Sequence, residues 1–172
     1  WSGDASGTTN PVSITMSAPR SVVANFGAAP VNYTVTTVPS GLQITVDGTA
    51  YTAPQTFSWT PGSSHTIATT SPQGSGSTRY VYASWSDGGA QSHSITAPAS
   101  ATTYTANFTT QYQLTTSANP ASAGSVSPAS GGYYNAGSGV QVTATANSGQ
   151  TFTGWSGDAS GTTNPVSITM SA

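Results

Sequence analysis

The chain has 172 residues, of which only 3% are charged, and its formal net charge is -2. Lysine, glutamate and cysteine are absent, and Arg20 and Arg79 are the only cations of the sequence. Two arginines cannot provide the basic surface that displaces counterions from nucleic-acid phosphates. No apolar run approaches the roughly 20 residues of a membrane helix. We therefore expect neither nucleic acid nor membrane insertion among its interactions.

The first segment, residues 1–18, reads WSGDASGTTNPVSITMSA and returns unchanged as residues 155–172. The period is thus 154 residues (155 minus 1). A match at all eighteen positions is typical of a tandem array of near-identical copies, the organisation to be sought first in any sequence. We interpret the chain as one period plus an overlap, cut from a longer polymer at an arbitrary phase. The absence of a visible signal peptide then carries no information.

Alternation of apolar and polar residues predicts strands along the chain, each with one buried face. In chain order, these stripes comprise Val12, Ile14 and Met16; Leu42, Ile44 and Val46; Tyr104, Ala106 and Phe108; and Val140, Val142, Ala144 and Ala146. No segment sustains a helical period, so we predict an all-β fold.

Turn signals separate the predicted strands. Asp47-Gly48 lies between two alternating runs and predicts a two-residue type I′ hairpin, which needs positive φ at both central residues. Pro61-Gly62 and Gly131-Gly132 predict further turns. Three more carboxylates stand alone in Trp-Ser-Gly-Asp or Trp-Ser-Asp-Gly, where an Asp commonly closes a turn through its own backbone; these are Asp4, Asp87 and Asp158.

Aromatic residues recur at regular places and predict the cores. Tyr82 and Trp85 are three positions apart, as are Phe152 and Trp155, so strict alternation would place each pair on opposite faces. A bulge or bend near Ala83 and near Gly154 would bring both rings of each pair into one core. The complete set of expected core aromatics is Trp1, Phe26, Tyr82, Trp85, Phe108, Phe152 and Trp155.

A weaker repeat divides the period into two related units. Both run from Trp-Ser through Ser-Ile-Thr and a proline to Ala-Asn-Phe, and NYTVTT (32–37) matches QYQLTT (111–116). We expect an A unit over residues 32–110 and the beginning of a B unit over residues 111–172. The equivalent of residues 19–31 in the next copy would complete B, and residues 1–31 would be the end of a preceding B.

These residues also carry a resemblance to a known family. The B unit, with SGGYYNAGSGVQVTA, TFTGWSGD at 151–158 and VVANF at 22–26, resembles the divergent internalin-B-type repeat modules of large bacterial secreted and cell-surface proteins. The A unit, with ITVDGTAY, FSWTPGSSHTI and VYASWSDGG, is similar to a companion module. The resemblance implies small β-grasp-like or sandwich-like modules serving as spacer, stalk or adhesive element, and it implies no catalytic residues.

Catalytic, metal and cofactor sites are not indicated by the sequence. Asp87, with His65 or His93 and a serine, would supply the residue types of a hydrolytic triad, but no nucleophile-elbow motif is present. The single carboxylates do not form the oxygen cluster that calcium prefers. We therefore predict that the protein is not an enzyme and that it binds neither a metal nor a cofactor.

The sequence leaves two interactions with carbohydrate possible: glycan binding and N-glycosylation. Exposed aromatic rings could stack on glycans, and the candidates are Tyr51, Trp59, Tyr133 and Tyr134, for which core packing is the alternative. The sequons Asn32-Tyr33-Thr34 and Asn107-Phe108-Thr109 could accept N-glycans.

The lack of charge suggests the function. Sheet proteins protect their edge strands with lysine and other charges against strand addition, and a net charge near zero promotes association. We therefore hypothesise that neighbouring copies pack end to end into a structural extracellular fibre or a bacterial cell-surface stalk. The alternative is an adhesin or glycan-binding module.

Overall fold

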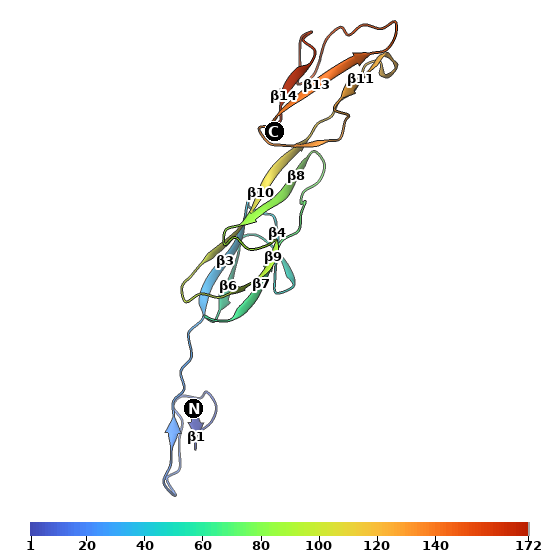
Figure 1. The fold of residues 1–172 in the computed structure, drawn as a ribbon. Helices are drawn as coiled ribbons and strands as arrows, with labels where there is room; N and C mark the ends of the chain where they lie inside the picture. Colours follow the sequence, from blue (N-terminus) through green and yellow to red (C-terminus); the bar gives the residue numbers. More distant parts are fainter. Residues whose placement is uncertain (172) are drawn as a thin grey trace.

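The computed structural model describes residues 1–171, and within them the chain is all-β, with no α-helix. Figure 1 shows an elongated molecule in three parts: an N-terminal segment, a central unit and a C-terminal unit. An extended stretch leads from the N-terminal segment into the central unit. We use these names for residues 1–30, 31–110 and 111–171.

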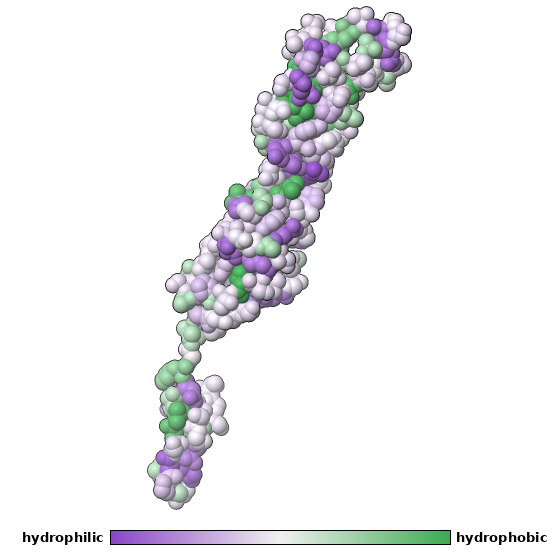
Figure 2. Space-filling view, in the orientation of Figure 1, coloured by the Kyte–Doolittle hydropathy of each residue, from purple (hydrophilic) through white to green (hydrophobic). Residues whose placement is uncertain are grey.

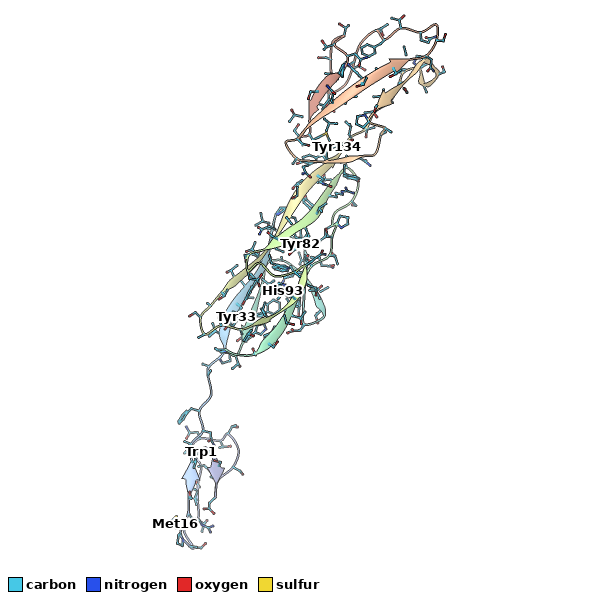
Figure 3. All side chains as sticks on the ribbon, in the orientation of Figure 1. Trp1, Met16, Tyr33, Tyr82, His93 and Tyr134 are labelled. Atoms are coloured by element: carbon cyan, nitrogen blue, oxygen red, sulfur yellow. The ribbon has the colours of Figure 1, made fainter. Side chains whose placement is uncertain are left out.

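The N-terminal segment contains two short strands, β1 (Ser2–Gly3) and β2 (Val22–Val23), paired antiparallel. Residues 12–15, with the sequence VSIT, lie in no strand. Its exposed apolar side chains include Met16, at the far tip of the molecule in Figure 3, and Phe26. This segment therefore shows apolar residues to solvent that a complete unit would bury.

The central unit is a two-layer sandwich. One layer contains β3 (Val31–Val38), β6 (Gln55–Trp59), β8 (Thr78–Trp85) and β10 (Thr103–Gln113). The other contains β4 (Gln43–Val46), β5 (Thr49–Thr52), β7 (Ser64–Ala68) and β9 (Ser92–Thr96), in the order β5-β4-β7-β9. Since the helix of a β-grasp is not found within residues 1–171, the sandwich-like alternative describes this unit.

Side chains from both layers meet in one core. Tyr33 and Val35 of β3 face Ile44 of β4 and Ile67 of β7, and all four are fully buried. They are buried because alternation directs every second side chain of each strand inward. The remaining buried members of this cluster are Leu42, Val46, Ala53, Trp59, Trp85, Ile95, Ala97, Tyr104, Ala106 and Phe108.

Several local predictions are confirmed. Asp47 (φ 48°) and Gly48 (φ 81°) join β4 to β5 with positive φ at both positions. In the pairing of β8 with β10, Ser84 faces Asn107 but Tyr82 faces Phe108, so Ala83 is the extra residue of a bulge. The bulge lets Tyr82 and Trp85 contribute to the same core.

The C-terminal unit is smaller and less enclosed. Its three-stranded sheet has the order β11-β13-β14, from β11 (Gly124–Ser127), β13 (Gly139–Ala146) and β14 (Val166–Thr169). A 3-10 turn, Ala121–Ala123, precedes β11, and β12 (Tyr133–Asn135) pairs with the end of β10. Its core has four buried residues, Leu114, Val140, Val142 and Met170.

Candidate functional site

The joint between the central and C-terminal units is built around one strand. β10 runs without interruption from the central core, where Phe108 is buried, to Gln113 beside Leu114 of the C-terminal core. Its first residues pair with β3, whereas Gln111–Gln113 pair with β12 on the same edge. β8 accompanies it along the other edge as far as Tyr112. The two units are therefore connected by paired strands rather than by a flexible linker (Figure 1).

A cation–π contact and side-chain hydrogen bonds connect the two units at this joint. The Arg79 guanidinium lies 4.1 Å from the ring centroid of Tyr133, and its Nε donates to Gln111 Oε1 at 2.8 Å. Gln111 in turn donates to Asn135 Oδ1 at 2.8 Å, and the Tyr133 hydroxyl donates to the Gly76 carbonyl oxygen. One of the two arginines thus fixes the C-terminal unit to the central one. This role of Arg79 was not predicted from the sequence, although a lone cation in an otherwise uncharged strand was a usable signal.

An open cleft lies beyond the joint. It has a volume of 1430 Å³ and runs between Leu114–Ser117 on one side and Thr151–Ser156 on the other. Val142 and Met170, two buried core residues, also line it. Neither bordering stretch carries a strand from 115 to 118 or from 151 to 154. The cleft therefore reaches part of the core of the C-terminal unit.

The repeated tryptophan loop keeps one local structure in both copies. Trp1 Nε1 donates to the Thr9 carbonyl at 2.7 Å, and Trp155 Nε1 donates to the Thr163 carbonyl at 2.9 Å. In the C-terminal unit this loop is also fastened to the sheet. Asn164 accepts from the Ala144 N–H at 2.9 Å and donates to the Ala144 carbonyl at 2.8 Å.

We expect Asn164→Ala to destabilise the C-terminal unit by about 1–3 kcal/mol, because it leaves both polar groups of the Ala144 backbone without their partner. The measurement is calorimetric unfolding of the variant beside the natural sequence. Asn10→Ala is the matched control, since Asn10 occupies the same place in the first copy and has no such strand beside it. Equal losses for the two variants would contradict the expectation.

Ser63, His65 and Asp47 form a hydrogen-bonded chain with the residue types of a hydrolytic triad. Ser63 Oγ lies 2.8 Å from His65 Nε2, and His65 Nδ1 lies 2.7 Å from Asp47 Oδ2. The single Ser63 proton, however, is donated to the Thr60 carbonyl at 2.7 Å, because a carbonyl oxygen can only accept. The Ser63 hydroxyl proton is therefore directed to the Thr60 carbonyl and not to His65.

The surroundings of this chain are those of a structural contact. The His65 ring stacks on Trp59 with centroids 4.1 Å apart, and none of the three residues lines the open cleft. The carboxylate of Asp47 also accepts the Thr66 N–H at 2.8 Å, which ties the β4–β5 turn to β7. The arrangement therefore connects the turn between β4 and β5 to β7 and to Ser63, which precedes it. The second histidine also makes local contacts: the His93 ring nitrogens lie 2.8 Å from Asp87 Oδ2 and 2.7 Å from the Ala90 carbonyl oxygen.

Both carboxylates of these pairs have perturbed acidity. Desolvation raises the pKa of Asp47, but the hydrogen bonds from His65 and the Thr66 N–H outweigh it, so its pKa lies below the usual 3.8. Desolvation also raises the pKa of Asp87. The hydrogen bonds from His93 and the Gly89 N–H outweigh this effect, so the pKa of Asp87 lies below 3.8. The ionised forms are therefore favoured by folding.

We expect the central unit to lose stability in acid. A folded-state pKa below the unfolded value contributes stability that is present above about pH 4 and is lost as the pH falls through the folded pKa. Melting temperatures measured from pH 7 to pH 2 should thus be level at first and fall below about pH 4. Asp47→Asn should lower the melting temperature at pH 7 and flatten the decline. Asp158→Asn, which removes an exposed carboxylate, should leave the curve unchanged.

The four candidate glycan-stacking rings do not form an exposed cluster. Trp59 is buried, contrary to that role, because alternation directs it inward, where it stacks with Tyr33 and Phe57. Tyr133 lies under Arg79 at the joint. The other two are half-buried against protein, Tyr51 at the edge of the Phe57 ring and Tyr134 beside the C-terminal core at the end of β10 (Figure 3).

The two sequons lie on strands. Asn32 is exposed on β3, whereas Asn107 is half-buried in β10 and its side chain donates to Ser84 Oγ at 3.4 Å. Asn32 is therefore the more accessible acceptor, and glycosylation stays a prediction.

Two expected core aromatics lie outside both cores. Phe26 is 95% exposed, and Trp1 is half-buried within its own loop. The expectation of a core position is wrong for them in this structure, because no sheet packs against residues 1–30. Trp85 and Phe108 are buried in the central core and Tyr82 packs against it. Phe152 and Trp155 are half-buried at the open cleft, with ring centroids 5.0 Å apart.

The carboxylates of Asp4 and Asp158 occupy equivalent positions in the repeated segment, but only Asp4 makes hydrogen bonds within the described residues. Asp4 Oδ2 accepts the Ser21 N–H at 2.8 Å, and its other oxygen lies 3.2 Å from Arg20. Asp158, its counterpart, makes no hydrogen bond or ion pair within residues 1–171. Over the same residues, no three potential ligands gather in a metal-binding group, and no helix has the length and apolarity needed to cross a bilayer.

The fold and the joint define the class of the protein: it consists of small all-β units that are connected through a shared strand. A sequence profile of the divergent InlB B-repeat domain matches residues 1–30 and 114–172, together more than half of the chain. The chain therefore belongs to the divergent InlB B-repeat family. Repeats of this family are typically found on cell-surface proteins and suggest a structural or surface-module role. No curated protein and no solved structure matches the chain.

Proposed function

We propose that the chain is a segment of a structural tandem-repeat protein of the bacterial surface, in which sandwich units pack end to end into an extracellular fibre or stalk. The observation that carries the proposal is the joint, where β10 belongs to two units at once and is paired on both edges. A strand shared in this way resists bending, since a bend would break ladder hydrogen bonds. Stiffness between units is what a stalk needs.

The composition supports the same function. Because only 3% of the residues of the chain are charged and lysine is absent, the strand edges have almost no charged side chains to protect them, so covering by neighbouring units is favoured. Glycan binding has less support, because Trp59 is buried and Tyr133 is engaged by Arg79. An enzymatic function also has less support, because the Ser63 proton is committed to the Thr60 carbonyl.

The test is imaging of purified arrays with one, two and four copies of the 154-residue period, by electron microscopy or atomic force microscopy. We expect straight rods whose length grows in proportion to copy number and whose melting temperature rises from one copy to two. Beads that bend freely about every joint, or a single copy that is fully monomeric and as stable as the longer arrays, would contradict the proposal. The control is Arg79→Ser with Tyr133→Ser, which should make the rods more flexible at one joint per copy.

A further inference from the structure

We propose that the free edge of β9 pairs antiparallel with β9 of a second copy of this chain, so that two stalks associate side by side. Ser94 would lie opposite Ser94 of the second copy, and Ser92 opposite Thr96. This inference deepens the proposed function, on which it rests, because it names the strand through which one stalk recognises another.

β9 is an edge strand of the central sandwich. Its sheet has the order β5-β4-β7-β9, so within residues 1–171 β9 has β7 on one side and no strand on the other. The eight strands of the sandwich all lie within residues 31–113. The N-terminal segment and the C-terminal unit continue the molecule at the two ends of the central unit, whereas β9 runs along its length (Figure 1). The neighbouring units of the same chain therefore leave this edge open.

The ladder with β7 shows which backbone groups of β9 point outward. The residues that flank β9, Gln91 and Ala97, both form hydrogen bonds across the ladder to the β7 side, at 3.3 and 2.8 Å. Because bonded residues alternate along an antiparallel strand, the odd-numbered residues of β9 direct their N–H and C=O groups at β7. The even-numbered residues direct theirs away from the sheet, and these are Ser92, Ser94 and Thr96.

The outward residues are accessible and unprotected. All three are exposed, and within residues 1–171 none of them forms a hydrogen bond outside the ladder of β7 and β9. β9 contains no lysine, arginine, carboxylate or proline, the residues that commonly protect an edge strand from pairing. Figure 2 shows mainly pale, weakly polar surface over the central unit. A strand added to this edge would therefore bury no charged side chain of β9.

β9 is complementary to itself. A dyad at Ser94 brings the three outward residues of one copy opposite the three of the other, so that each opposed pair can exchange both of its backbone hydrogen bonds. On the exposed face, hydroxyl side chains lie opposite hydroxyl side chains. On the inner face, His93 lies opposite Ile95, and the His93 ring keeps its contact with Asp87 Oδ2 of its own copy at 2.8 Å. No like charges on β9 then face one another across the pair.

The repeat favours a second copy over an unrelated extended peptide. Addition of a strand to a sheet edge is a common mode of recognition that uses mainly backbone hydrogen bonds. A tandem array presents the same edge once in every 154 residues, so a second array can occupy several edges at once and gain affinity from each. Because the dyad reverses the direction of the second strand, the two stalks run in opposite directions, as stalks of two facing cell surfaces would.

β6, an edge strand of the other sheet, offers a shorter edge. The Thr34 N–H of β3 donates to the Thr102 carbonyl oxygen on the β10 side at 3.1 Å, so the odd-numbered residues of β3 are the ones that bond to β6. Only Thr56 and Ser58 of β6 then point outward. Pro54, which has no N–H to donate, lies directly before the strand. β6 is therefore the internal comparison for β9.

The first test is self-association of the 172-residue chain, measured by sedimentation equilibrium over a range of concentrations. We expect concentration-dependent dimers for the natural sequence. Ser94→Pro removes an outward N–H without removing a bond to β7, and it should weaken the dimer at least about tenfold, the equivalent of the hydrogen bonds lost across the dyad. Ser94→Thr keeps the N–H and should associate like the natural sequence. A natural sequence that stays monomeric, or equal association of the two variants, overturns the inference.

Two charge variants test the dyad without changing the backbone. Ser94→Lys and Ser94→Asp each place like charges directly opposite one another, so each alone should associate more weakly than the natural sequence. An equal mixture of the two should associate more tightly than either, because opposite charges then face each other. A mixture that associates no better than the separate variants overturns the dyad. Ser58→Lys and Ser58→Asp on β6 are the matched controls, and each alone should associate like the natural sequence.

Disulfide formation tests the direction of pairing, since the natural sequence has no cysteine. Ser92→Cys in one preparation should cross-link to Thr96→Cys in another, whereas Ser92→Cys alone should not, because antiparallel pairing keeps the two copies of residue 92 apart. The reverse preference overturns the antiparallel register. Straight multi-copy rods that never pair would leave the stalk standing and overturn the side-by-side contact. Paired arrays that bend freely at every joint would contradict the stalk and support the contact.

Discussion

Ile67→Ala is expected to lower the unfolding free energy of the central unit by about 2–5 kcal/mol. Ile67 is fully buried on β7, an interior strand of its sheet, and lies in one cluster with Ile44 and Tyr33. Removing its outer carbons leaves a cavity between two packed layers that the strands cannot close without breaking their ladders. A small domain has a total stability of about 5–15 kcal/mol, so this loss is a large part of it.

The measurement is urea unfolding of the 172-residue chain, followed by the fluorescence of Trp59 and Trp85 in the central core. Thr66→Ser is the control, because Thr66 is the exposed neighbour of Ile67 on the same strand and should change the stability by less than about 0.5 kcal/mol. A loss below about 1 kcal/mol for Ile67→Ala would mean that the two layers do not pack as described.

Trp85→Ala is expected to cost the central unit about 3–5 kcal/mol. The Trp85 ring is 2% exposed, and its Nε1 donates to the Gln91 carbonyl at 3.2 Å. It follows the bulge at Ala83, which turns the ring into the core beside Tyr82. The variant therefore removes both a large apolar contact and the only side-chain partner described for that carbonyl oxygen.

The repeat provides the matched comparison for this prediction. Trp1 has the corresponding place in the sequence and donates to the Thr9 carbonyl, but it belongs to neither core cluster. Trp1→Ala should therefore leave the melting of both units unchanged in the monomer. Similar losses for Trp1→Ala and Trp85→Ala, measured by calorimetry, would show that the tryptophan loop itself, rather than the sandwich core, determines stability.

The candidate site could be predicted from the sequence only in part. The correspondence of VANF at 23–26 with TANF at 105–108 was readable, whereas the expectation that a following copy completes the last unit stays a prediction. The joint was not, because nothing in the local pattern says that Arg79 of one strand meets Tyr133 from a different unit. The chain of Ser63, His65 and Asp47 was also missed, since Asp47 lies 18 positions from His65 and the two meet only when β4 pairs with β7.

The repeated eighteen residues separate local from tertiary causes within one molecule. Both copies close the same loop, in which the tryptophan indole donates to the carbonyl of the residue eight positions later. Its glycines, its polar side chains and contacts between residues close in sequence suffice to form it. The strand that follows is different. Val166–Thr169 forms β14, but the identical residues 12–15 form no strand.

The difference comes from the neighbour, not from the segment. β14 exists because β13 pairs with it antiparallel, with Val140 opposite Ile168 and Val142 opposite Val166. Met170 is accordingly 5% exposed, and Met16 is 74% exposed. The alternation, the turns and the all-β class were thus determined by the sequence alone, since they depend on local geometry. Which alternating segment becomes a strand, and which apolar side chain becomes core, was decided by the tertiary structure, because a strand needs a partner edge and a buried side chain needs a facing layer.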